Sequence, residues 1–148
     1  MGPLPRTLTG KRYIVVAIDW LTKWPEAKSL ELADAQTIAA FLHEQVICQH
    51  GLLQQLTSDR GTEFCNDLIT ELSQTYRIHH IRTTAYHPQG NGLTERMNQT
   101  IKNTLSKMCD TYDNWDHWLP SALFAIRCAP QKTTRFSPFE LVYGRLPN

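Results

Sequence analysis

Two acidic residues in this 148-residue chain stand where folding could bring them together to do chemistry. Asp59 follows the short stretch Leu56 to Ser58 and precedes Arg60-Gly61, as expected at the carboxyl end of a buried strand. Glu95 stands in the first turn of a predicted long helix, and residues 60–94, 35 in all, separate the two acids. Two adjacent carboxylates repel by about 1 kcal/mol in water and about 4 in a shielded site, so the pair needs a metal or a proton. Hard oxygen ligands favour Mg²⁺ or Mn²⁺ over zinc.

Each acid also has a purely structural interpretation. Asp59 before Arg60-Gly61 is a common arrangement in turns. An acid such as Glu95 in the first turn of a helix is stabilised by the helix dipole, typically by less than about 1 kcal/mol. Neither residue alone identifies an active site, so the interpretation depends on the sequence that surrounds both.

Alternating strands and helices are predicted to position the two acids. Runs of β-branched and apolar residues predict strands, and apolar residues at every third or fourth position predict helices. The predicted strands are Tyr13–Asp19, Trp24–Leu30, Leu56–Ser58 and His79–Thr83, and the predicted helices begin after Asp34, at Asn66 or Asp67, at Leu93, at Trp115 and at Ser137-Pro138. The first helix is expected to end before Gly51, and the glycine-rich residues 86–92 are expected to form a mobile loop. This order predicts an α/β domain with a mixed sheet flanked by helices.

The bulk composition fits one domain, residues 1–148, with 41% hydrophobic residues to fill a single core. A net charge of +1 gives no overall attraction to nucleic acid, although a local basic face remains open. The four cysteines form no C-x-x-C pair, which argues against a zinc site and a disulfide scaffold and favours a reduced, intracellular protein. No apolar stretch approaches the roughly 18 residues of a membrane span, so no membrane partner is expected.

The sequence around the two acids resembles a known family. Residues 58–64 (SDRGTEF) and 84–96 (TAYHPQGNGLTER) resemble the second and third carboxylate motifs of integrases from Ty3/gypsy-type retrotransposons and retroviruses. Residues 137–145 (SPFELVYGR) resemble the motif that closes the core of gypsy-type elements, and residues 2–5 (GPLP) resemble the stretch near its start. The interval between the acids also matches the family, and the resemblance covers essentially the whole chain in order.

The resemblance implies an RNase H-like fold, the integrase catalytic core, and two reactions on DNA: trimming the ends of the element and joining them to target DNA. By resemblance, Asp59 and Glu95 are the second and third members of an Asp, Asp, Glu triad that binds two Mg²⁺ or Mn²⁺ ions. The family's first aspartate lies three residues before the glycine that corresponds to Gly2, a position before Met1. The chain is therefore interpreted as a catalytic core without its first strand and first aspartate. Asp19 lies too close in sequence to Asp59 to replace that aspartate, so this chain alone is expected to be inactive or nearly so.

Two alternatives remain open at this stage. The chain could be a catalytically silent, transposon-derived domain that binds nucleic acid or a protein. It could also begin at an internal methionine, with the missing aspartate encoded just upstream.

Further residues are candidates for DNA contact by resemblance. Lys102 lies two helical turns after Glu95, on the same face, and competes with the interpretation of a solvated lysine. The remaining candidates are Asn91, His87, Gln99, Arg96 and, beside His87, Tyr86. Adjacent residues on a strand face opposite sides, so His79 and His80 are not expected to chelate one ion. The four tryptophans are interpreted as core or interface residues, and a homodimer or higher oligomer acting in the nucleus is expected from the family.

Overall fold

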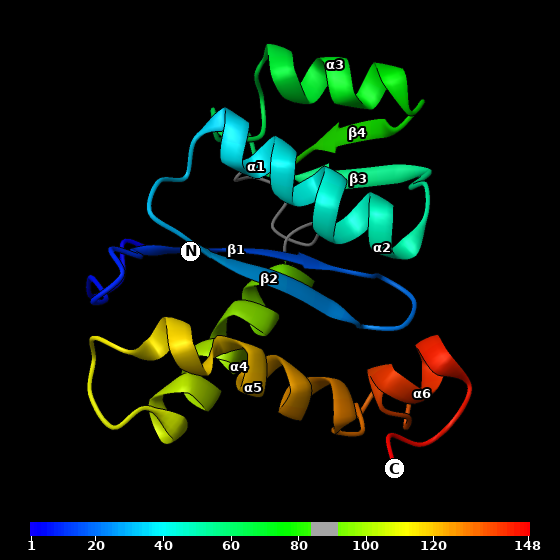
Figure 1. Ribbon diagram of the computed structural model, residues 1–148. Coiled ribbons are helices and arrows are strands. Elements are labelled where there is room, and N and C mark those ends of the chain that lie inside the picture. Colours follow the sequence, from blue (N-terminus) through cyan, green and yellow to red (C-terminus); the bar gives the residue numbers. More distant parts are fainter. Residues whose placement is uncertain (84–91) are drawn as a thin grey trace.

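The computed structural model describes residues 1–83 and 92–148, in which strands and helices alternate largely as predicted. A pair of strands, β1 (Tyr13–Ile18) and β2 (Pro25–Leu30), precedes a helix in three segments, α1 (Ala35–Phe41), η1 (Leu42–Ile47) and α2 (Cys48–His50). Strand β3 (Gln55–Ser58), helix α3 (Asp67–Thr75) and strand β4 (His79–Arg82) come next, followed by helices α4 (Gly92–Met108), α5 (Trp115–Cys128) and α6 (Pro138–Tyr143). Figure 1 shows α1 and α2 on one side of β1 and β2, and α5 on the other.

The first two strands form an antiparallel hairpin that runs from the pair Tyr13 and Leu30 to the pair Ile18 and Pro25. The β-branched run of β1 suits a strand that is packed on both faces. Asp19 closes the turn, because its Oδ2 accepts bonds from the backbone N–H of Thr22 at 2.8 Å and from the Thr22 hydroxyl at 2.7 Å. The hairpin therefore presents both of its faces to helices.

The helix after the hairpin begins where the sequence predicts. Asp34 is its N-cap, with the side chain accepting from the backbone N–H of Thr37 at 2.9 Å, and Gly51 with φ +93° ends it. The segment Leu42–Ile47 is π-helical, which the helical spacing in the sequence does not predict. Two pairs of buried residues, Phe41 with Val46 and Leu42 with Ile47, are each separated by five positions. A π-helix bonds residues five positions apart and so brings such pairs toward one face.

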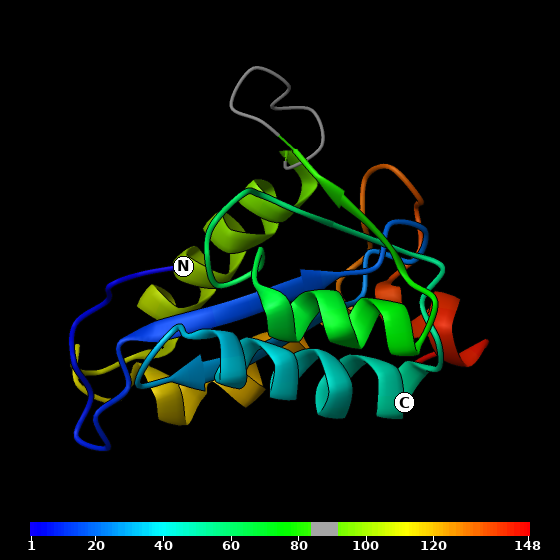
Figure 2. The ribbon, with the colours of Figure 1, turned by 90° about the horizontal axis from the view of Figure 1, so that it is seen from above.

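Two groups of buried side chains lie on opposite faces of the hairpin. Ile14 packs with Met97, Ile101 and Leu105 of α4 and with the buried face of α5. Its neighbour Val15 points the other way and packs with α1, η1 and Ile69 of α3. Figure 2 shows α3 running beside α1 and η1, with which it shares this second core. Alternation along β1 thus divides the apolar interior between two helical layers.

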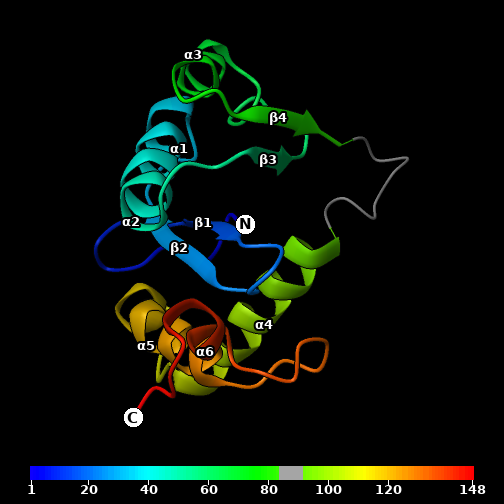
Figure 3. The ribbon, with the colours of Figure 1, turned by 90° about the vertical axis from the view of Figure 1, so that its right-hand side faces the viewer.

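The strands do not form the single mixed sheet that the sequence predicts. Instead, β1 pairs only with β2, and β3 pairs in parallel with β4 from Gln55 opposite His79 to Ser58 opposite Arg82. Figure 3 shows β1 and β2 apart from β3 and β4, with α1 and α3 along one side and α4 on the other. No described segment pairs with both β1 and β3, and on its second edge β1 is bonded only to residues near the start of the chain, where Met1 bonds to Ile14.

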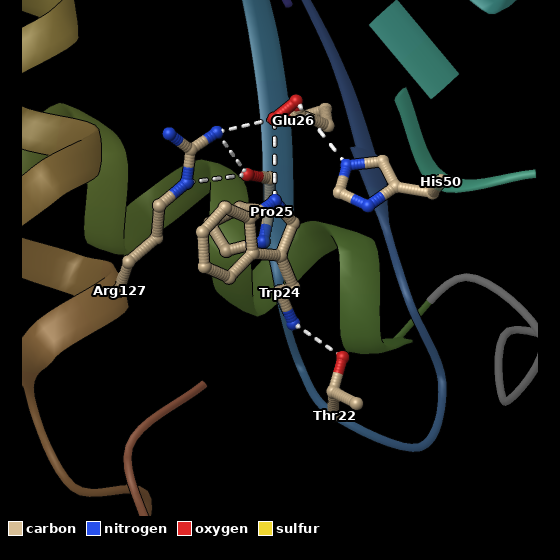
Figure 4. A network of polar contacts seen from close by, with 6 residues as sticks. All are labelled: Thr22, Trp24, Pro25, Glu26, His50 and Arg127. Atoms are coloured by element: carbon tan, nitrogen blue, oxygen red, sulfur yellow. Dashed lines mark hydrogen bonds and ion pairs between the residues drawn. The ribbon is translucent and has the colours of Figure 1, made fainter. Parts of the chain in front are cut away.

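A network of polar contacts fastens β2 to α5 (Figure 4). The Nη2 of Arg127 lies 2.5 Å from Oε1 of Glu26, and its Nε and Nη2 donate to the backbone oxygen of Pro25 at 3.1 and 2.7 Å. The guanidinium stacks on Trp24, 4.4 Å from the ring centroid, and Trp24 Nε1 donates to Glu26 at 3.2 Å. His50 Nε2 lies 3.7 Å from the other Glu26 oxygen. Burial lowers the pKa of the Arg127 guanidinium, and Glu26 opposes this effect.

The last helix has the predicted start, with Ser137 as N-cap and Pro138 in its first turn. Ser137 Oγ accepts from the backbone N–H of Glu140 at 3.1 Å, and Glu140 Oε2 accepts from the backbone N–H of Ser137 at 2.9 Å. Gly144 ends the helix in the left-handed conformation at φ +69°. No helix formed by the described residues is long and apolar enough to cross a membrane.

The cysteines and tryptophans test two further expectations. All four cysteines are free thiols, as predicted. Trp24 and Trp115 are buried in the core, whereas Trp20 is 69% exposed, so of the two predicted roles, core or interface, only an interface role stays open for Trp20.

Candidate functional site

Asp59 follows the last residue of β3, at the predicted end of a strand, with its side chain exposed; the strand is not buried as predicted, because only Ser58 of its four residues is buried. Its Oδ1 accepts a bond from the backbone N–H of Gly61 at 2.8 Å, which orients the carboxylate as an Asx turn does. Asp59 therefore makes the turn contact that its structural interpretation predicts, and this contact does not decide whether Asp59 also has a chemical role. This contact occupies one oxygen and leaves the other open to a ligand, because Oδ2 has no hydrogen bond among the described residues.

Glu95 lies in the first turn of α4, also with an exposed side chain. No hydrogen bond or ion pair holds its carboxylate among the described residues. Its backbone is anchored indirectly, because Met97 and Ile101, on the next turns of the same helix, are 5% and 0% exposed in the core. The helix is therefore fixed by its buried face, while none of residues 1–83 and 92–148 pairs with the Glu95 carboxylate.

Both acids line the same cleft, which measures about 930 Å³. Residues 15–19 of β1 and its turn form one wall, and β3 with Asp59 forms the other. Phe41, Leu42 and Val46 of α1 and η1 contribute apolar lining, and Leu93 to Glu95 with Asn98 of α4 line it as well. The cleft occupies the space between β1 and β3, and carboxylates from both sides border it.

The pKa of the Met1 amino group depends on charged residues from two parts of the fold. It donates to the backbone oxygen of Ile14 at 2.9 Å, and Ile14 N–H donates back to the oxygen of Met1 at 3.0 Å. Burial lowers the pKa of this amino group, Glu63 and Asp59 act to raise it, and Lys102 acts to lower it. Asp59 on β3 and Lys102 on α4 thus act on the same point beside β1.

Comparison with known proteins identifies the family. The profile described as "Integrase core domain" matches residues 3–88, more than half of the chain. The chain belongs to the integrase core domain family. The matched range includes Asp59 and ends before Glu95.

Relatives of this integrase core occur in mobile elements and retroviruses. It is 32% identical over 149 aligned positions to the "Retrovirus-related Pol polyprotein from transposon 412" of Drosophila melanogaster, covering 100% of this chain. It is 34% identical over 139 positions to the Gag-Pol polyprotein of avian reticuloendotheliosis virus, covering 93% of this chain. The chain spans 12% of the length of each of these polyproteins.

The fold agrees with a solved integrase structure. The crystal structure of the catalytic core domain of BIV integrase superimposes with a TM-score of 0.71 at 25% identity, covering 88% of this chain and 85% of that one. The RNase H-like integrase fold expected from the resemblance is confirmed.

The predicted DNA-contacting residues of this integrase core lie partly within the described structure. Lys102, Arg96 and Gln99 are exposed on α4, as the predicted helix requires. Gln99 Nε2 donates to Asn103 Oδ1 at 2.9 Å along the helix surface. Asn91, His87 and Tyr86 lie outside the described residues.

The donor set of the cleft fits a hard divalent cation only in part. In the described part of the chain, Oδ2 of Asp59 and both carboxylate oxygens of Glu95 have no hydrogen-bond partner, whereas Oδ1 of Asp59 accepts from Gly61. The described residues contain no group of three or more histidines, cysteines or acids that could hold a metal. The two acids are therefore suitable ligands for Mg²⁺ or Mn²⁺, but they are two and not three.

Two further residues complete the account of the site. Asp19 lines the cleft, and its Oδ2 accepts both bonds from Thr22 in the hairpin turn, so the expectation that it does not replace the first aspartate stays a prediction. His79 is exposed and His80 is half-buried, so the two do not act together on one ion. Sequence reasoning missed the contact of His80 with Ser58, the residue before Asp59, at 2.7 Å. The period-two alternation of β3 and β4, once paired, could have found it.

Proposed function

We propose that this domain is the catalytic core of a retrotransposon or retroviral type of integrase, of the Ty3/gypsy kind, which trims the ends of element DNA and joins them to target DNA. The observation that carries the proposal is that Asp59 and Glu95 line one cleft, although the 35 residues 60–94 lie between them in the sequence. Family membership and the similarity to polyproteins of mobile elements support it. Localisation in the nucleus, where target DNA lies, belongs to the same proposal.

Asp59 and Glu95 are the residues that would hold Mg²⁺ or Mn²⁺. Two such ions, when bound, activate the attacking oxygen and stabilise the leaving oxygen of a phosphoryl transfer. The protein's own part is positioning. The Gly61 N–H orients Asp59, and the core packing of α4 sets the direction in which Glu95 leaves the helix.

The cation-bearing and amide side chains of α4 are proposed to hold DNA phosphates beside these acids. Lys102 and Arg96 supply positive charge and Gln99 supplies a donor, and Asn91 and His87 are proposed as further contacts to the DNA end. Because the net charge is only +1, this affinity depends on a few local contacts. The DNA affinity should fall as salt is added. In a plot of the logarithm of the binding constant against the logarithm of the salt concentration, the slope should be about −0.9 per phosphate contacted.

The geometry of β1 indicates where a third carboxylate would enter. Met1 and Ile14 form an antiparallel bridge, so a strand continuing upstream would place the second residue before Met1 opposite Val16. That residue is the position three before Gly2. Val16 packs with the α4 and α5 core, and a side chain opposite it would point to the same face as α4, which carries Glu95. We propose that activity of the domain requires such a third carboxylate beside Asp59 and Glu95.

Strand transfer on donor-end DNA, with Mg²⁺ and separately with Mn²⁺, tests the proposal. The chain as given is compared with a chain extended by an apolar strand that carries aspartate three residues before Gly2, and with the same extension carrying asparagine. We expect only the form extended with aspartate to join DNA. In that form, Asp59→Asn or Glu95→Gln should abolish joining. Joining that survives Asp59→Asn would refute the assigned roles.

The alternative is a catalytically silent domain that binds nucleic acid or protein. The described residues contain no group of three or more histidines, cysteines or acids that could hold a metal, and this observation favours the alternative. Salt-dependent DNA binding without joining in any extended form would select this alternative.

A homodimer or higher oligomer is also proposed. Exposed apolar side chains cluster toward the end of the chain, where Phe124 of α5 is 60% exposed and Tyr143 of α6 is 55% exposed. Figure 1 shows these two helices next to each other at one end of the molecule. Burying such side chains against a second copy would remove apolar area from water. Sedimentation of the chain with and without Phe124→Ser tests this assembly.

A further inference from the structure

The peptide groups on both sides of Asp59 are tied down by neighbouring side chains and backbone. The oxygen of Ser58 accepts from the backbone N–H of Thr83 at 2.8 Å and from its hydroxyl at 3.2 Å. The oxygen of Asp59 accepts from the hydroxyl of Ser58 at 2.8 Å. The Asp59 side chain is exposed, yet the carbonyl group before it, of Ser58, and its own carbonyl group both accept hydrogen bonds.

The hydroxyl that holds Asp59 is itself held by a histidine. Ser58 is 7% exposed, and its Oγ lies 2.7 Å from Nε2 of His80. Ser58 stands opposite Arg82 in the parallel pair, so His80 lies two residues earlier on the same face of β4. The contact therefore crosses diagonally from β3 to β4.

Counting protons fixes the state of this imidazole. A serine hydroxyl has one proton, and Ser58 gives it to the oxygen of Asp59. Nε2 of His80 must then be the donor to Oγ, which leaves Nδ1 without a proton in the neutral ring. Nδ1 is buried and has no hydrogen-bond partner among the described residues, as suits an imidazole that stays neutral. Burial, followed by the charge of Arg82, lowers the pKa of His80 in agreement with this state.

We propose that Ser58 and His80 are positioning residues for Asp59: the neutral imidazole orients the serine hydroxyl, and the hydroxyl fixes the backbone from which the candidate metal ligand projects. The inference rests on the proposed function of Asp59 as a metal ligand. Groups that orient a ligand strongly affect metal affinity, because small displacements of a ligand spoil the coordination geometry.

Binding of Mn²⁺ to the chain, followed by its electron paramagnetic resonance signal, tests the inference. Ser58→Ala and His80→Phe remove the donor and the orienting group, and each is expected to weaken binding about tenfold. His80→Gln retains an amide donor near the position of Nε2 and is expected to restore most of the affinity. His79→Phe, at the exposed neighbouring histidine, is the matched control and should leave affinity unchanged. Thermal unfolding of every variant shows whether the chain remains folded.

A nuclear magnetic resonance measurement separates this inference from the metal assignment. The ¹⁵N shifts of His80 are expected to show the Nε2–H tautomer, and the carbonyl ¹³C shift of Asp59 is expected to move in Ser58→Ala and His80→Phe but not in His79→Phe. If Mn²⁺ binds and Asp59→Asn leaves that binding intact, the proposed function fails while the carbonyl shift still decides the positioning role. An Asp59 carbonyl that stays unchanged in Ser58→Ala, or equal Mn²⁺ affinity in His80→Phe and His80→Gln, overturns the inference.

Discussion

Replacing Arg127 by methionine should remove the main link between β2 and α5. The side chain is 20% exposed and its partner Glu26 is 13% exposed, so most of both charges lies away from water. Methionine keeps a similar apolar stem and can still pack on Trp24, so the substitution chiefly deletes the charge and the donors to Pro25. The largely buried Glu26 carboxylate then keeps two polar contacts among the described residues. It accepts a hydrogen bond from Trp24 Nε1 and lies near His50 Nε2.

The expected cost follows from this burial. Removing one partner of a buried ion pair costs about 3–5 kcal/mol, because the other charge stays buried without compensation. The remaining exposure of both groups lowers this figure, and we expect about 3 kcal/mol for Arg127→Met. In a domain of this size, that corresponds to a fall in Tm of roughly 6–12 °C.

The assay is urea unfolding at pH 7, with the slope m checked for constancy across variants. Glu26→Gln and the double variant complete a thermodynamic cycle, in which the pair should show a coupling of about 1–2 kcal/mol. Arg6→Met is the control, since Arg6 is exposed and has no ion pair among the described residues. A loss below about 0.5 kcal/mol for Arg127→Met, the typical limit for a surface substitution, would show that the network does not stabilise the fold.

Three further predictions concern the core, a helix cap and pH. Ile101→Ala removes a side chain that is 0% exposed between α4 and β1 and should cost about 2–5 kcal/mol in urea unfolding, whereas exposed Lys107→Ala on the same helix should cost little. Ser137→Ala deletes the N-cap of α6 and should cost about 1 kcal/mol by the same measurement, with Ser137→Thr retaining part of it. The pKa of His80 is lowered on folding, so the unfolded chain takes up its proton first. Above about pH 6.5, His80 should therefore not affect the free energy of unfolding. As the pH falls below about 6.5, this free energy should decline, and His80→Gln should reduce the decline. An identical pH profile in the variant would contradict the lowered pKa.

Local chemistry explains why many elements were predictable from the sequence. The N-caps Asp34, Asn66 and Ser137 each accept a backbone N–H in the way their residue types favour, and Gly51 and Gly144 end helices at positive φ. The apolar spacing of α4 and α5 corresponds to the buried residues of one core. Such features depend on neighbours within a few residues, which the sequence displays directly.

Features that depend on distant partners were not predictable in the same way. The π-helical turns of η1 accompany the packing of Phe41, Leu42 and Val46 in the core that Val15 and Ile69 share, and no residue type in the sequence predicts them. The division of the strands into two pairs depends on which edges find a partner in three dimensions. Likewise, the contact between Ser58 and His80 requires the parallel register of β3 and β4. For the site, the sequence placed Asp59 and Glu95 through motif resemblance, and the fold added the shared cleft and the bond from Gly61.

The two faces of the hairpin carry different parts of the candidate site. Asp59 belongs to the half of the molecule built on Val15, α1 and α3, and Glu95 belongs to the half built on Ile14, α4 and α5. Strands β1 and β2 separate the two halves, because one core packs on each face of the hairpin, so the position of one half relative to the other depends on them. A substitution that bends this hairpin, even one far from either acid, would change the separation of the ligands without touching them. The affinity proposed for Mg²⁺ or Mn²⁺ should therefore depend on the rigidity of a hairpin that contributes neither Asp59 nor Glu95.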